Sequence, residues 1–232
     1  MVKEFIINNK DIQLHYNNSN LKEVPVVILN TYGNEGKEVL DKCLYFKCKE
    51  FILVAIYNLD WNNDMTPWFA PRLNERDVDC LGKADEYIKL LTNKIIPQVQ
   101  EYINNTLKIK IEYFAIAGYS LAGLFAVYSA YKTDIFTRIA SASGSFWFPK
   151  FVDFVKTNNI SSNVRKIYFS LGNKESKVKN QILATGEKNT MSLEKIYNSK
   201  GIQTKYEENE GNHFRDATLR MGKGIKWILD EQ

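Results

Sequence analysis

Gly118-Tyr119-Ser120-Leu121-Ala122-Gly123 separates two apolar runs of different character. The run before it, residues 112–117, has the residue types of a β-strand, and the run after it, 124–128, has those of a helix. Small residues on both sides of the serine permit a very tight turn, in which the serine adopts a strained backbone and exposes its hydroxyl. The following helix would present backbone N–H groups and a positive dipole at this turn.

Two interpretations of Ser120 are open at this point. A strand, a Gly-x-Ser-x-small turn and a helix, in this order, are typical of the nucleophile elbow of α/β-hydrolases. Serine at the junction of a strand and a helix is also a good helix N-cap, which involves no chemistry. The rest of the chain must distinguish them, because a catalytic serine needs a base and usually an acid that orients it.

Apolar patterns along the chain predict strands that alternate with helices. Runs 24–29 and 51–57 are continuously apolar, as in strands buried on both faces of a parallel sheet. Apolar residues at spacings of three and four predict a long helix over 81–103, kinked or divided by Pro97. The other expected strands are 5–7, 12–16, 112–117, 136–142, 165–171 and 203–207, and the other expected helices are 35–46, 124–128, 148–155, 182–199 and 218–229. We therefore expect a single α/β-hydrolase domain over 1–232, with a mostly parallel central sheet, helices on both faces and no large cap domain.

The chain has only two histidines, which restricts the choice of a base. His15 lies in an early predicted strand, whereas the α/β-hydrolase fold orders its triad as serine, acid, histidine. His213 follows the last predicted strand, in a loop of small and polar residues that can carry an imidazole to a serine. We expect His213 to be the base, and the alternative is a solvent-exposed loop histidine.

The acid should follow the strand that lies between the elbow and the histidine. Glu175 is the only carboxylate in the loop 172–176 after that strand. A carboxylate there would fix the imidazole tautomer and stabilise the imidazolium that forms. Asp216 is too close to His213 along the chain, and Glu187 lies well inside the next segment. The alternative for Glu175 is a surface glutamate among lysines.

An oxyanion needs two backbone donors in this fold. The N–H of Leu121, directly after the serine, is the first. The second is expected from the loop 30–36, where we assign the N–H of Tyr32. The alternative for that loop is an ordinary turn.

These features resemble an esterase family that groups enterochelin esterase, S-formylglutathione hydrolase and feruloyl esterase domains. The resemblance extends from Val24 to the C-terminus and is carried by the segments 64–68, 95–99, 118–124, 172–176 and 211–214. It implies Ser120 as nucleophile, His213 as base and Glu175 as acid. Two departures are visible: Asn30-Thr31 replaces a common His-Gly in the oxyanion loop, and Ala122 replaces a common glycine of the elbow.

Tryptophans mark candidate walls of a substrate pocket. Trp61 and Trp68 lie in a proline-containing segment, 60–71, after the strand 51–57, and Trp147 follows the strand 136–142. Loops at the carboxyl ends of strands are where α/β enzymes bind ligands. An aromatic pocket would favour an apolar or aromatic ester. The alternative for Trp61 and Trp68 is that their rings pack in a satellite hydrophobic cluster.

Composition narrows the remaining function classes. The 232 residues are 44% hydrophobic and 25% charged with a formal net charge of +4, as in ordinary globular proteins. Lys/Arg clusters interleaved with aromatics are absent, so we expect no nucleic-acid partner. Neither a signal-peptide core nor a transmembrane stretch is present, and Cys43, Cys48 and Cys80 form no metal or disulfide framework. We therefore expect reduced cysteines, a cytoplasmic protein without membrane partner, and a monomer or homodimer.

The expected activity is that of a serine carboxylester hydrolase that acts on a small-molecule ester without cofactor or metal. One alternative keeps the triad but hydrolyses a thioester, such as S-formylglutathione, or a siderophore ester. A second alternative is a non-catalytic binding protein on the same fold, because a fold alone does not prove chemistry.

Overall fold

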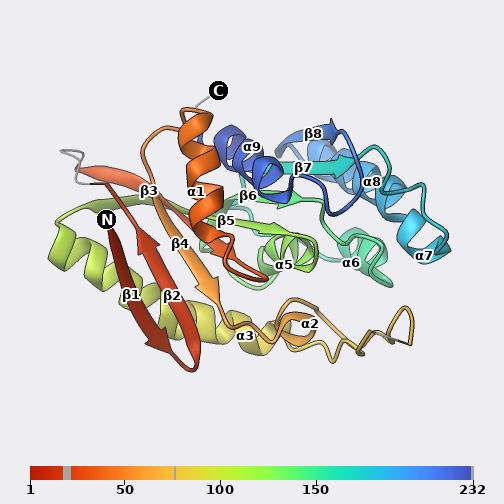
Figure 1. Ribbon diagram of the computed structural model, residues 1–232, viewed down its shortest axis with the longest axis horizontal. Coiled ribbons are helices and arrows are strands. Elements are labelled where there is room, and N and C mark those ends of the chain that lie inside the picture. The colour runs from red at the N-terminus through yellow and green to blue at the C-terminus, as the bar shows by residue number, and fades with distance from the viewer. Residues whose placement is uncertain (18–21, 76, 231–232) are drawn as a thin grey trace.

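The structure is a computed structural model that describes residues 1–17, 22–75 and 77–230. Its centre is an eight-stranded sheet with the order β1-β2-β4-β3-β5-β6-β7-β8 (Figure 1). The hairpin β1–β2 is antiparallel and β2 pairs antiparallel with β4, whereas every pair from β4 to β8 is parallel. The strands are β1 (Val2–Ile7), β2 (Lys10–His15), β3 (Glu23–Asn30), β4 (Ile52–Tyr57), β5 (Lys110–Tyr119), β6 (Phe136–Ala142), β7 (Lys166–Gly172) and β8 (Gln203–Asn209).

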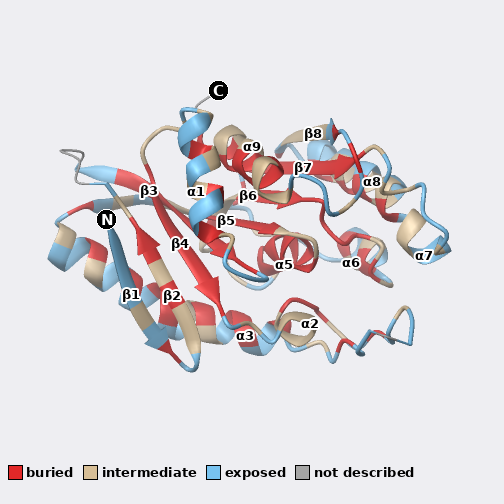
Figure 2. Cartoon of the chain, viewed as in Figure 1, coloured by how far each residue is buried: buried red, intermediate tan, exposed pale blue. Residues whose placement is uncertain are grey.

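Helices cover both faces of this sheet. On one face lie α1 (Gly36–Tyr45) and α9 (Ala217–Leu229), and on the other lie α5 (Leu121–Ser129), α6 (Phe151–Thr157) and α8 (Gly186–Ser199) (Figure 1). Successive residues of β3 alternate between the two cores, so that Val26 faces one and Val27 the other. Strands β4 and β7 are consequently buried along their whole length (Figure 2). This architecture confirms the predicted α/β-hydrolase fold, and no separate cap domain covers the sheet within the described residues.

The predicted helix over 81–103 is shifted, and Pro97 does not divide it into separate rods. Helical backbone begins with α3 (Ala84–Leu90) and continues through π-helical Leu91–Ile95, α4 (Ile96–Glu101) and π-helical Tyr102–Leu107. Pro97 lacks an N–H, and the π-helical turn directly before it changes the hydrogen-bond register at that point. The helix therefore continues past Pro97 because its backbone hydrogen-bond register changes there.

Other boundaries also differ from the sequence prediction. Helix α6 begins at Phe151 and not at residue 148, because Lys150 adopts a left-handed conformation with φ 65°. The predicted helix 182–199 is divided into α7 (Gln181–Ala184) and α8. Part of the predicted loop 60–71 forms a short helix, α2 (Trp61–Asp64). None of these differences moves the carboxyl ends of β5, β6 and β7, whose following loops meet at one edge of the sheet.

Candidate active site

Ser120 occupies the sharp turn between β5 and α5. Its backbone has φ 57° and ψ −122°, a conformation that costs a non-glycine residue about 1–3 kcal/mol. Gly118 is required beside it, since a Cβ there would lie 2.4 Å from the backbone of Ala122. Ser120 stands at the N-cap position of α5, but its hydroxyl makes no capping hydrogen bond. The N-cap interpretation therefore does not account for the side chain.

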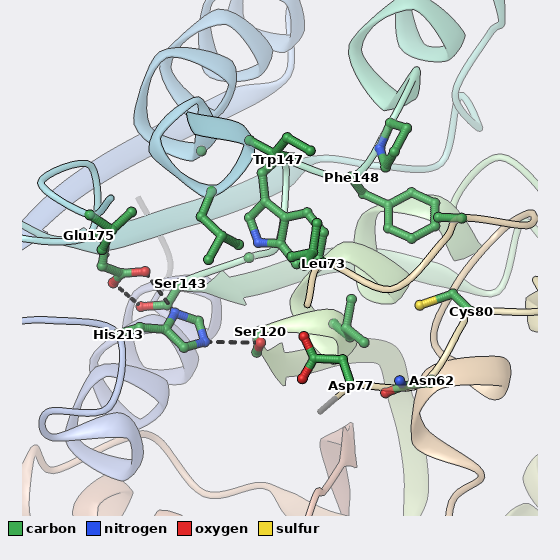
Figure 3. Close-up of a pocket in the computed structure, with 18 of the residues that line it drawn as sticks. Asn62, Leu73, Asp77, Cys80, Ser120, Ser143, Trp147, Phe148, Glu175 and His213 are labelled. Carbon is green, nitrogen blue, oxygen red and sulfur yellow. Dashed lines mark hydrogen bonds and ion pairs between the residues drawn. The ribbon is translucent and has the colours of Figure 1, made fainter. Parts of the chain in front are cut away.

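The hydroxyl of Ser120 lies beside the imidazole of His213, a residue near the C-terminus. The distance from His213 Nε2 to Ser120 Oγ is 3.0 Å, and that from His213 Nδ1 to Glu175 Oε2 is 2.8 Å (Figure 3). The structure thus brings together the three predicted side chains in a serine, histidine, carboxylate chain of hydrogen bonds. Ser145 adds a second hydroxyl, 3.2 Å from Ser120 Oγ.

The Glu175 carboxylate is held by donors on both of its oxygens. Besides His213, it accepts a hydrogen bond of 2.6 Å from the N–H of Gly172 and one of 2.8 Å from the hydroxyl of Ser143. Burial by itself would raise the pKa of Glu175, but the hydrogen bonds from His213, Gly172 and Ser143 lower it by more. The pKa therefore lies below its ordinary value, and the group is an anion at neutral pH.

Arg220 is a component of the site that the sequence patterns did not reveal. Its side chain is 1% exposed, and its Nη1 donates to Glu175 Oε1 at 2.8 Å and to Ser143 Oγ at 2.9 Å. Its Nη2 donates to the backbone carbonyls of Glu210 and Asn212, in the loop that carries His213. One buried guanidinium therefore ties the carboxylate to the histidine loop.

Tyr119 holds the same loop from the strand side. Its hydroxyl donates a 2.6 Å hydrogen bond to the carbonyl of His213 and accepts one from Arg220. Neither contact has a local sequence signal, because each joins residues that are far apart along the chain; Arg220 and Tyr119, for example, are 101 residues apart. The residues next to Arg220 and Tyr119 in the sequence are also those of an ordinary helix and an ordinary strand, and they indicate no role in a site.

The two predicted oxyanion donors have different surroundings. Leu121 is the first residue of α5, where N–H groups have no acceptor within the helix. The N–H of Tyr32, by contrast, donates at 2.7 Å to Oε1 of Glu35. Tyr32 is 78% exposed and is not among the residues that line the cavity beside Ser120. The structure therefore corrects the assignment of Tyr32, whose N–H is already engaged in a turn.

A cavity of about 570 Å³ opens beside Ser120. Trp61 and Trp147 line it, together with the apolar side chains of Leu73, Val178, Ile182 and Leu183. Figure 3 shows Trp147 and Leu73 at this cavity. Trp68 does not line it. Its ring packs against Phe148, Phe151 and Phe154, and its Nε1 donates to the carbonyl of Pro149. For Trp68 the satellite-cluster interpretation is therefore the correct one.

Comparison with known proteins assigns the family. Residues 16–218 match the model of a family described as "Putative esterase". The chain belongs to this esterase family. This membership confirms the resemblance found in the sequence. Uncharacterized protein YbbA of Bacillus subtilis (strain 168) is 27% identical to this chain over 154 residues, which are 66% of the chain and 61% of that relative. The match thus spans less than two thirds of the relative's length.

Solved structures show the same fold at low sequence identity. Siderophore hydrolase EstA from Aspergillus nidulans superposes with a TM-score of 0.73 at 16% identity, covering 98% of this chain and 93% of EstA. An IroE-like serine hydrolase from Shewanella oneidensis gives a TM-score of 0.75 at 15% identity, covering 99% and 79%. These matches establish the architecture.

Ranges 1–17, 22–75 and 77–230 contain no group of three or more His, Cys, Asp or Glu side chains placed to hold a metal ion. In the same ranges no helix combines the length and apolarity needed to cross a lipid bilayer.

Proposed function

We propose that this esterase is a serine carboxylester hydrolase that uses Ser120 as nucleophile, His213 as base and Glu175 as orienting acid. The observation that carries the proposal is the continuous chain of hydrogen bonds from Ser120 Oγ through both ring nitrogens of His213 to Glu175. Membership of the esterase family and the strained elbow support the same assignment.

In the proposed cycle, Ser120 Oγ attacks the ester carbonyl while His213 Nε2 takes the hydroxyl proton. The oxyanion that forms accepts a hydrogen bond from the N–H of Leu121, and the dipole of α5 stabilises its charge. His213 then gives its proton to the leaving alcohol, and an acyl group remains on Ser120. Water attacks this acyl-enzyme with His213 again as base, which releases the carboxylic acid and restores the serine.

Arg220 and Tyr119 act in this proposal as positioning residues. Arg220 pairs with Glu175 and fixes the loop that carries His213, and Tyr119 anchors the carbonyl of His213 itself. Preorganisation of this kind matters because a displacement of about 1 Å in a reacting group can cost about 10²-fold in rate.

The lining of the cavity favours an apolar or aromatic ester. Trp61 and Trp147 present aromatic faces, and Ile182 and Val178 extend an apolar wall to the rim, where they are 48% and 38% exposed. A siderophore ester is a candidate within this class, because EstA, which shares the fold, is a siderophore hydrolase. The same triad would also open a thioester, so both belong in the substrate panel.

The primary test compares hydrolysis of short p-nitrophenyl esters by the wild type and by Ser120→Ala. The rate should fall by about 10⁶-fold, as for removal of a serine nucleophile. A fluorophosphonate should label the wild type at Ser120. Equal rates in the two proteins would exclude the mechanism, and an intact triad that takes no label would favour the non-catalytic binding protein.

The acid is tested separately by Glu175→Gln, which should reduce kcat by about 10⁴-fold because the amide no longer selects the required tautomer. Glu187→Gln is the matched control, since Glu187 also lines the cavity but has no contact with His213 among the hydrogen bonds described for that ring. Comparable losses in both variants would move the role away from Glu175.

A further inference from the structure

The end of helix α1 brings two cysteines together. Lys47 is left-handed with φ 54°, its N–H donates to the carbonyl of Leu44, and the N–H of Cys48 donates to the carbonyl of Cys43 at 3.0 Å. This pair of bonds defines a Schellman motif, in which the residue two beyond the C-cap packs against the third residue from the helix end. Those two positions are Cys48 and Cys43. Their thiols are hydrogen-bonded to each other, and neither is in a disulfide.

The two thiols have different access to solvent. Cys43 is fully buried in the core between α1 and α9, whereas Cys48 is half-buried at the edge of that core. A reagent in solution can therefore reach Cys48 first. Cys43 can therefore react only with a disulfide that has already formed at Cys48.

Charges from α9 distinguish the thiols further. Lys226 donates to the carbonyl of Lys47, next to Cys48, and pairs with Asp230 at 2.7 Å. The hydrogen bond from Cys43 and then the Lys226 ammonium lower the pKa of the Cys48 thiol, against the opposing effects of burial and of Asp230. The same hydrogen bond, followed by burial, raises the pKa of Cys43. Cys48 is thus the sulfur that ionises, and Cys43 remains the protonated donor.

We propose that Cys43 and Cys48 form a thiol–disulfide exchange site for low-molecular-weight disulfides, with Cys48 as attacking and Cys43 as resolving cysteine. The Cys48 thiolate attacks a disulfide RSSR, forms a mixed disulfide and releases one thiolate RS⁻. Cys43 then loses its proton to the released thiolate and attacks the sulfur of Cys48, which expels the second RS⁻. The protein loses two electrons and two thiol hydrogens, and RSSR is reduced to two thiols. This site is independent of the proposed esterase function.

Oxidised glutathione is the probe for the test, applied to the folded protein in a Cys80→Ser background so that only the pair is read out. Trypsin cleaves after Lys42, Lys47 and Lys49, so the two cysteines fall in separate peptides unless a disulfide joins them. Mass spectrometry should show that the starting protein loses two hydrogens and yields the joined peptides. Adding Cys43→Ser should instead trap a stable glutathione adduct on Cys48, and adding Cys48→Ser should abolish both products.

Two results would overturn the proposal. One is a glutathione adduct that persists on Cys48 when Cys43 is present, which would show that Cys43 does not resolve it. The other is undiminished modification of Cys43 when Cys48 is replaced by serine. Cys43→Ala repeats the trapping experiment if the buried serine impairs folding. Lys226→Met should slow formation of the adduct several-fold at neutral pH, and this difference should vanish at a pH where the thiol is ionised in both proteins.

Discussion

Replacement of Arg220 by methionine would test how the carboxylate of Glu175 is maintained as a buried anion. The guanidinium and the carboxylate are 1% and 10% exposed and 2.8 Å apart, so loss of the cation leaves a desolvated charge. Breaking a buried pair in this way costs about 3–5 kcal/mol of folding free energy. We expect Arg220→Met to lose that amount in urea unfolding at neutral pH.

The loss should depend on pH in a defined direction. In the wild type the pKa of Glu175 is below its ordinary value, so its stabilisation is present above the unfolded pKa and is lost as the pH falls through the folded pKa. Without Arg220 the folded pKa of Glu175 rises, and protonation at acid pH removes the stranded charge. The difference in unfolding free energy between the two proteins should therefore shrink from about pH 8 to about pH 4.

Ser143→Ala is the matched control, since it removes a neutral donor to the same carboxylate oxygen. Ser143→Ala should lower the free energy of unfolding by about 1 kcal/mol. This loss should depend on pH less than the loss in Arg220→Met. Kinetics add an independent readout: Arg220 does not line the cavity, so kcat should fall about 10²-fold while KM changes little. A stability difference that is constant with pH, or an unchanged kcat, would refute the positioning role of Arg220.

Three further substitutions probe the elbow, the histidine loop and the cavity. Ser120→Gly should be about 1 kcal/mol more stable than Ser120→Ala in thermal unfolding, because glycine adopts φ 57° without strain. The greater backbone entropy that glycine loses on folding offsets part of this gain. Equal stabilities would show that the turn stores no strain. Tyr119→Phe should lower kcat about ten-fold, corresponding to roughly 1.4 kcal/mol, by releasing the carbonyl of His213, with KM retained; an increase confined to KM would contradict this assignment. Trp147→Ala should raise KM for aryl esters more than for acetyl esters, and a uniform effect on both would remove Trp147 from substrate contact.

Much of this fold was accessible from the sequence because its signals are local. The buried strands β3 and β4 appear as unbroken apolar runs, and the elbow requires small residues at fixed positions around Ser120. The scarcity of histidine then limited the partners of Ser120 to His213. The family comparison supports the fold and the esterase class reached in this way.

The remaining features depend on contacts that no sequence window contains. Arg220 occupies one position in a helix rich in basic residues, and only the folded chain shows its guanidinium beside Glu175, 45 residues away. Trp61 and Trp68 occur in the same segment with similar neighbours, yet only Trp61 lines the cavity. The N–H of Tyr32 is engaged because the local path of its loop brings the carboxylate of Glu35 to it.

One wall of the cavity is supported by a different part of the molecule from the proposed catalytic side chains. Ser120 follows β5 directly, whereas Leu73 and Asp77 belong to a segment outside the sheet that is joined across its base by a β-bridge between Ala70 and Cys80. Exchange of this segment would alter which ester fits without disturbing the interior of the sheet. Libraries restricted to 71–79 should therefore yield folded variants with new substrate preferences at high frequency. The division allows selectivity to evolve separately from reactivity.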